Sequence, residues 1–131
     1  MKSLPKIGTS GELSFVVGPE HAITFAGEGM PAVLSTPHLI GLLERTARDA
    51  VADCLDANER TVGTEIDIRH LAPTPLGQTV ICRARLIHAE GRSLTFQVEA
   101  HDARELIARG THKRAVIHVE AFTRRVASKR V

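Results

Sequence analysis

One amphipathic helix followed by four consecutive strand-like runs is the feature that most constrains this fold. Residues 37–57 place apolar side chains in one arc at about 100° per residue, with charged side chains in the opposite arc. The four later runs alternate apolar and polar residues and are separated by turn-forming segments. They span residues 61–71, 79–88, 93–101 and 106–119. This order predicts an α+β fold in which the helix lies across one face of an antiparallel sheet.

Smaller elements complete the expected fold. A first strand is expected over residues 11–17, and a short one over 21–25. The last strand should carry a bulge near Gly110, where its alternation loses phase. The residues after 119 are interpreted as a short helical tail. Five or six strands around one helix leave exposed sheet edges, which dimerisation would cover.

The start of the helix is well marked. Thr36 is a good N-cap and Pro37 a good first helical residue. The segment 26–35 before it is small, irregular and contains glycine. We interpret it as a loop that covers whatever lies beside the helix start.

The composition fits a single domain over residues 1–131. A net charge of +2, the absence of Trp and Tyr, and only four Phe argue against nucleic-acid binding. No apolar run approaches the roughly 20 residues of a membrane span, and the first residues lack the apolar core of a signal peptide. Cys54 and Cys82 have no metal-ligand spacing and suit a reducing compartment, so a cytoplasmic protein is expected.

Glu44 stands where the helix pattern requires an apolar side chain. It falls in the apolar arc, between Val51 and Leu55. The plain explanation is a carboxylate at the border of that arc, turned to water and paired with Arg48 one turn later. The alternative is an acid–base group, because titratable side chains held in apolar surroundings concentrate at functional sites.

His70 is the second residue that departs from its pattern. It continues the inward face of an alternating strand, formed by Val62, Thr64, Ile66 and Ile68. A satisfied core or edge histidine is the plain explanation, and a catalytic imidazole is the alternative. The other six histidines form no metal-ligand constellation, so no metal site is expected.

Thr36 is the third candidate, with helix capping as its plain role. A free hydroxyl there would stand at an electropositive helix end, suited to a carbonyl oxygen or a water. Eight residues separate Thr36 from Glu44, about 12 Å along a helix axis. The two side chains are therefore expected to act on different atoms of a substrate that lies between them.

Three blocks of sequence resemble the fluoroacetyl-CoA thioesterase family, within the hotdog-fold thioesterases. They are STPHLIGLLERTA, GTEIDIRHLAPTPLG and GTHKRAVIHVEAF, and the similarity extends from about Gly8 to Phe122. The resemblance implies a hotdog fold, in which an antiparallel sheet wraps around one long central helix. It also implies a homodimer, or a tetramer built from it, with active sites near the subunit interface. The implied reaction is hydrolysis of an acyl-CoA thioester, with coenzyme A as part of the substrate and no other cofactor.

The same resemblance assigns roles to individual residues. The catalytic Thr, Glu and His of the family fall on Thr36, Glu44 and His70, with Glu44 as nucleophile or general base. Gly63 matches a glycine that lines the family's site, and Arg114 matches the Arg of the third block. The segment before the helix is shorter than in the fluoroacetyl specialist, and Met30 stands where a gating Phe is expected. A short- or medium-chain acyl group, or an aromatic one, is therefore at least as well suited to this chain as fluoroacetyl.

Other functions remain as alternatives. The main one is a non-catalytic hotdog protein that binds acyl-CoA as a sensor or partner module. A hydratase would need an Asp–His pair in a different motif, which the sequence lacks, and a purely structural homodimer is the last alternative. If CoA binds, its phosphates should meet cations, and the candidates are Lys113, Arg114, Arg124 and Arg125.

Overall fold

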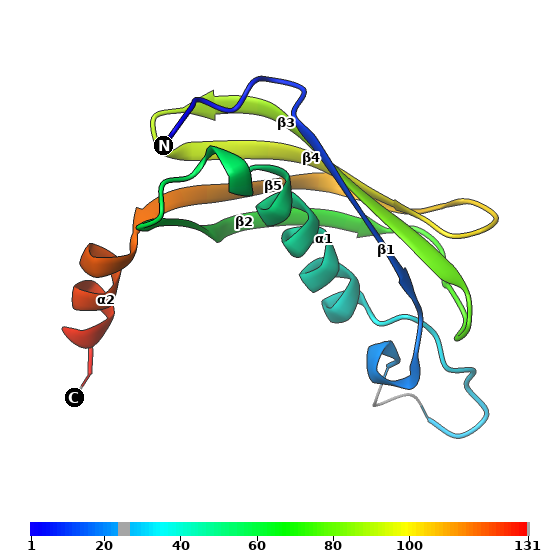
Figure 1. Cartoon of the computed structure of the whole chain (residues 1–131). Coiled ribbons are helices and arrows are strands. Elements are labelled where there is room, and N and C mark those ends of the chain that lie inside the picture. Colours follow the sequence, from blue (N-terminus) through cyan, green and yellow to red (C-terminus); the bar gives the residue numbers. More distant parts are fainter. Residues whose placement is uncertain (24–26, 131) are drawn as a thin grey trace.

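The computed structural model describes residues 1–23 and 27–130 and contains five strands, two α-helices and two short 3-10 turns. The strands are β1 (Ser10–Val16), β2 (Glu59–His70), β3 (Thr79–Glu90), β4 (Ser93–His101) and β5 (Leu106–His118). They form one antiparallel sheet in the order β1-β3-β4-β5-β2. Helix α1 (Thr36–Ala50) crosses one face of this curved sheet, and α2 (Val119–Ala127) extends from the end of β5 on the same side (Figure 1). The predicted α+β architecture is confirmed.

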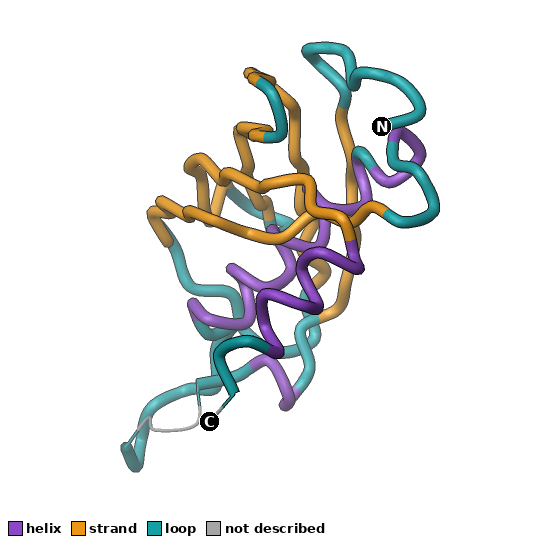
Figure 2. Tube along the Cα trace, turned by 90° about the vertical axis from the view of Figure 1, so that its left-hand side faces the viewer, coloured by secondary structure: helices purple, strands orange, loops and turns teal. Residues whose placement is uncertain are grey.

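The core lies between α1 and the inner face of the sheet. Leu39, Leu43 and Ala47 on α1 are fully buried, at the helical spacing that the sequence predicts. They pack against alternate residues of the central strands, among them Val80, Cys82, Leu86, Leu94, Phe96 and Val98. Figure 2 shows the strands as one layer with the helices beneath it.

The helix differs from its prediction at both ends. Ser35, not Thr36, is the N-cap, because its hydroxyl accepts the backbone N–H of His38. The helix stops at Ala50, and a separate 3-10 turn, Ala52–Cys54, follows where a continuous helix to residue 57 was expected. The earlier end turns the chain back sooner toward β2.

The predicted strands are found with small shifts of their ends, except for the short one over 21–25. His21 belongs to the 3-10 turn Pro19–His21, and Ala22 forms only an isolated bridge with Leu34. Residues 24 and 25 of that prediction lie outside the described part of the chain. The helical tail is confirmed as α2.

The bulges lie elsewhere than expected. Pairing is regular on both sides of Gly110, whereas the register of β2 against β5 shifts between Gly63 and Glu65. This shift reverses which residues of β2 face α1, so that Glu59 and Thr61 are buried before it and the even-numbered positions turn inward after it. Gly110 is required for another reason: a Cβ there would lie 1.9 Å from the backbone oxygen of Asp67.

None of the helices among the described residues is long and apolar enough to cross a membrane. Both cysteines are free, with Cys82 buried in the core and Cys54 half-buried. Burial raises the pKa of the Cys82 thiol to about 12, so this side chain behaves as a small apolar group.

Candidate active site

Thr36 and His70 are in direct contact. The Thr36 hydroxyl is free of the capping role, which Ser35 fulfils, and Thr36 Oγ1 lies 2.8 Å from His70 Nδ1. This hydrogen bond joins the first residue of α1 to the last residue of β2. His70 Nε2 is buried and has no hydrogen-bond partner among the described residues. Burial lowers the pKa of His70, which keeps the imidazole neutral near pH 7.

Glu44 is half-buried, with 39% of its side chain exposed, and its partner is not the one expected. Arg48 pairs with its neighbour Asp49 at 3.1 Å instead. Glu44 Oε2 lies 3.7 Å from Nη1 of Arg114. Arg114 in turn bonds to Thr61, which lies 53 positions earlier in the sequence. The carboxylate at the border of the apolar arc therefore faces a buried cation rather than a surface one.

Arg114 is fixed from three directions. Its Nε donates to Thr61 Oγ1 and its Nη2 to the Thr61 carbonyl, each at 2.8 Å. Its Nη1 lies 3.1 Å from His112 Nε2 and faces Glu44. A guanidinium with its donors committed in this way has one orientation, and it points a positive edge at the Glu44 carboxylate.

His112 orients Arg114 and is fully buried. Its Nδ1 lies 2.8 Å from the Glu65 carbonyl oxygen, which can only accept a hydrogen bond. Nδ1 therefore carries the proton, and Nε2 accepts from Arg114. Burial, together with the nearby Arg114 charge, lowers the pKa of His112 and keeps this tautomer neutral.

Gly63 lies against the same carboxylate. A Cβ at this position would stand 2.8 Å from Glu44 Oε2 and 3.2 Å from His112 Cε1. The missing side chain thus leaves room for the Glu44 carboxylate beside the β2 backbone. The position of the register shift, directly after Gly63, turns this stretch of β2 toward α1.

The six predicted residues therefore fall into two groups and one outlier. Thr36 and His70 form one pair, while Glu44, Gly63 and Arg114 form a second cluster about two helical turns along α1. Met30 is 63% exposed in the segment before α1. Because Arg114 is buried, it belongs to the Glu44 cluster and not with the surface cations near a phosphate.

The sequence did not predict two residues of the second cluster, namely His112 and Thr61. For His112 the signal was the strand period: from Ala108 onward every second residue of β5 faces α1, which includes His112 and Arg114. The bulge wrongly placed at Gly110 concealed this phase. Thr61 lies before the register shift of β2, where the odd-numbered residues are the buried ones.

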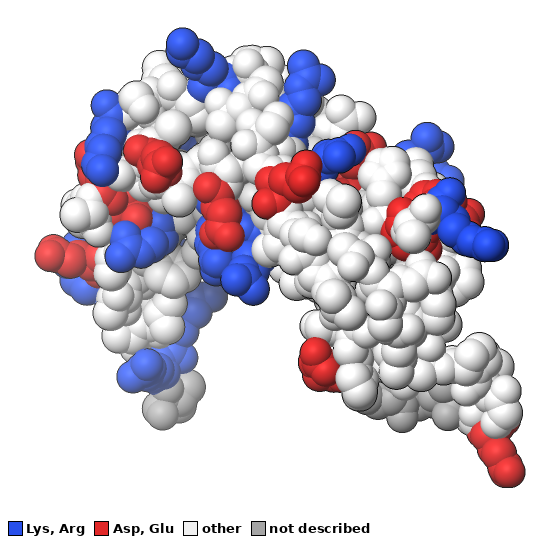
Figure 3. Space-filling view, turned by 45° about the vertical axis from the view of Figure 1, so that its right-hand side comes forward, with Lys and Arg blue, Asp and Glu red and all other residues white. Residues whose placement is uncertain are grey.

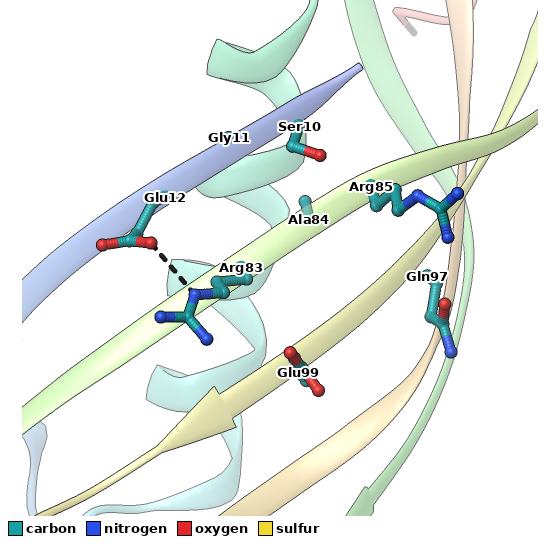
Figure 4. Close-up of a pocket in the computed structure, with 8 residues that line it drawn as sticks. All are labelled: Ser10, Gly11, Glu12, Arg83, Ala84, Arg85, Gln97 and Glu99. Atoms are coloured by element: carbon teal, nitrogen blue, oxygen red, sulfur yellow. Dashed lines mark hydrogen bonds and ion pairs between the residues drawn. The ribbon is translucent and has the colours of Figure 1, made fainter. Parts of the chain in front are cut away.

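A cavity of about 560 Å³ lies away from this site, on the outer face of the sheet, and is lined by residues of β1, β3 and β4 (Figure 4). Its Arg83 pairs with Glu12 at 3.0 Å. Arg85 and Gln97 lie apart from this pair, on β3 and β4 (Figure 4). None of the predicted catalytic residues lines it. Within residues 1–23 and 27–130, no group of His, Cys, Asp and Glu side chains could hold a metal ion.

Acid should destabilise this fold, because burial lowers the pKa of His70 and His112. The unfolded chain binds protons at His70 and His112 near pH 6.5, whereas the folded chain resists them, so the free energy of unfolding should fall as pH drops below 6.5. Urea unfolding at pH 7 and pH 5 measures this loss. His112→Asn, which keeps a donor for the Glu65 carbonyl, should reduce it. An unchanged pH dependence in that variant would show that His112 does not cause the loss of stability in acid.

Comparisons with known proteins bear on this arrangement. The fluoroacetyl-CoA thioesterase of Streptantibioticus cattleyicolor is 38% identical, over 98% of this chain and 97% of that protein. The solved structure of the fluoroacetyl-CoA thioesterase FlK superposes with a TM-score of 0.91 at 36% identity, covering 98% of this chain and 100% of that one. A thioesterase superfamily member from Thermus thermophilus reaches a TM-score of 0.86 at 27% identity, over 98% and 97% of the two chains.

These likenesses confirm the hotdog fold and the thioester-hydrolase class that the three sequence blocks implied. The family model described as fluoroacetyl-CoA-specific thioesterase matches residues 17–120, which include Thr36, Glu44 and His70. This chain therefore belongs to the fluoroacetyl-CoA-specific thioesterase family.

Proposed function

We propose that this protein hydrolyses an acyl-CoA thioester to a carboxylate and free CoA, with Glu44 as nucleophile or general base, assisted by His70 and Thr36. The observation that carries the proposal is the position of Glu44. Its carboxylate is half-exposed on α1, lies beside the open face of Gly63 and is oriented by buried Arg114. A related structure of the FlK thioesterase, at 38% identity and a TM-score of 0.83 over 90% of this chain and 99% of that one, holds fluoroacetate and CoA.

The thioester lies along α1, between the Thr36–His70 pair and Glu44. At the helix start Pro37 has no N–H, and the His38 and Leu39 N–H groups bond to Ser35, so the Thr36 N–H is the donor proposed to polarise the carbonyl. One such donor contributes about 3–4 kcal/mol to a transition state. In the nucleophilic route a Glu44 oxygen attacks the carbonyl carbon, the C–S bond breaks, and water then cleaves the resulting anhydride. In the general-base route Glu44 takes a proton from water as that water attacks.

His70 and Thr36 act at the other end of this thioester. The neutral imidazole can orient the attacking water or accept its proton, and the imidazolium so formed can return that proton to the departing thiolate. The hydrogen bond to Thr36 fixes the ring. Placed acid–base groups of this kind contribute roughly 10²–10⁴-fold to a rate. Exposed cations serve the phosphates of CoA, with Arg124 and Arg125 on α2 better placed than Lys113, which pairs with Glu65 at 3.7 Å.

The acyl group is set by the segment before α1. Met30 replaces the gating Phe expected in a fluoroacetyl specialist, and it is largely exposed. We therefore propose a broader acyl preference, for short- or medium-chain or aromatic acyl groups. The two free thiols are consistent with the cytoplasm as the compartment.

The proposed assembly is a homodimer formed along β2. This strand lies at one edge of the sheet, so one row of its backbone N–H and C=O groups has no strand partner in the described chain. Pairing of two β2 edges across a two-fold axis would join the sheets of two protomers and remove that edge.

Release of free thiol from a panel of acyl-CoAs tests the function. We expect hydrolysis of several acyl groups, with fluoroacetyl-CoA not strongly preferred over acetyl-CoA. Strong selectivity for fluoroacetyl-CoA would contradict the assigned role of Met30. No hydrolysis of any substrate, with CoA binding retained, would instead favour the sensor.

A further inference from the structure

Helix α2 carries an apolar side that nothing in the described chain covers. Val119, Phe122 and Val126 follow helical spacing and are 38%, 40% and 43% exposed. No residue of α2 is buried, and the helix contacts the end of β5 and, through the Val119 N–H, Asn58. Phe122 borders a cavity of about 260 Å³. A helix of nine residues is too short to be stable in water without tertiary packing, so this side needs a partner.

Acidic and basic side chains are concentrated in different parts of the chain. Residues 7–44 contain no Lys or Arg. Exposed Glu20 and Glu28 lie in residues 18–23 and 27–34, which we call the acidic lobe. The end of the chain, by contrast, carries Arg124, Arg125, Lys129 and Arg130. Two lobes hang from the sheet, with basic side chains at the tip of one and acidic side chains at the tip of the other (Figure 3).

The acidic lobe also presents apolar surface. Its Met30 is 63% exposed, and Leu71, which lies outside the lobe and directly after His70, is 50% exposed. The acidic lobe and α2 are therefore complementary, since each combines exposed apolar surface with charges, and the charges are of opposite sign.

Strand β2 connects the two lobes. At its first end, the Val119 N–H donates to the Asn58 carbonyl at 2.9 Å, so α2 begins beside Glu59. At its last end, His70 binds Thr36, which follows the acidic lobe. If two β2 edges pair antiparallel, the first end of each strand meets the last end of the other, and the basic lobe of each protomer meets the acidic lobe of its partner. Both lobes lie on the α1 side of the sheet (Figure 1).

We propose that α2 of one protomer docks its apolar side on the acidic lobe (residues 18–23 and 27–34) of a second copy of this chain, next to Thr36 and His70 of that copy. This rests on the homodimer of the proposed function. Each active site is then walled by Phe122 and Val126 from the partner, and the basic end of α2 stands at the mouth of the partner's site. Both apolar surfaces are covered by one contact.

Site-directed crosslinking tests the contact without relying on hydrolysis. In a Cys54→Ser background, one chain carries Met30→Cys and another Val126→Cys, and a short flexible bismaleimide is added to each alone and to their mixture. We expect a covalent dimer chiefly in the mixture, after exchange of subunits. No such product from a mixture that sediments as a dimer would overturn the proposal, and so would a monomeric protein.

A charged substitution with a matched control measures the strength of the contact. Val126→Glu places a carboxylate against the acidic lobe and should weaken dimerisation about tenfold and raise KM for acyl-CoA. Ile87→Glu, at an equally exposed apolar residue on β3, should change neither. Equal effects of the two variants would contradict docking by α2. Thiol release by wild type separately tests the hydrolase, so a crosslinked dimer without hydrolysis would refute that function alone.

Discussion

Glu44→Gln is expected to reduce kcat for acyl-CoA hydrolysis by at least about 100-fold, equivalent to about 2.7 kcal/mol of transition-state stabilisation. The amide keeps the size of the side chain but can neither attack a thioester as a carboxylate nor take a proton from water. Thiol release under saturating substrate measures the loss. The melting temperature should move by only a few degrees, because Glu44 is half-exposed and its ion pair with Arg114 spans 3.7 Å.

Glu65→Gln is the matched control. Glu65 is also on β2, next to the site in sequence, but its carboxylate is 58% exposed and faces Lys113. The same chemical change there should leave kcat within about twofold, since surface ion pairs contribute little. Wild-type-like turnover in Glu44→Gln would remove this carboxylate from the mechanism.

The fold could be predicted because the spacing of apolar residues within each helix or strand is visible in the local sequence. Leu39, Leu43 and Ala47 on the helix, and Val80 and Cys82 on a strand, mark their inward faces by spacing alone. Helix ends depend on finer competition: Ser35 and Thr36 are both good N-caps, and the structure gives the cap to Ser35. That choice matters for function, because it frees the Thr36 hydroxyl for His70.

The candidate site was predictable only in part, because its contacts join distant strands. Glu44 and His70 stood out as polar residues at apolar positions, but nothing local paired Glu44 with Arg114 rather than Arg48. His112 was missed because a bulge was wrongly expected at Gly110, which obscured the inward alternation of β5. The roles of Thr36, Gly63 and Arg114 came from resemblance to a family, and their placement around Glu44 and His70 required the folded chain.

Gly63→Ala should lower kcat by roughly 10- to 100-fold while removing no functional group. The new methyl carbon would stand 2.8 Å from Glu44 Oε2, so the carboxylate must move. Because the Glu44 side chain is flexible at this point, the shift should change the free energy of unfolding little. Its effect on catalysis is large, because a displacement of about 1 Å from the reacting geometry can reduce a rate 10²-fold. Steady-state kinetics and a thermal melt separate these two effects.

A double-mutant cycle identifies the cause. If the alanine acts by displacing the Glu44 carboxylate, adding it to Glu44→Gln should lower the residual rate by less than about threefold, because the group it displaces is already inactive. If instead the methyl blocks the substrate, the two losses should multiply. The contact between Gly63 and Glu44 predicts the first result, since the carboxylate oxygen is the atom nearest to the new carbon, ahead of His112 Cε1 at 3.2 Å and Arg114 Nη1 at 3.6 Å. Multiplied losses would mean that the open face of Gly63 serves the acyl group directly.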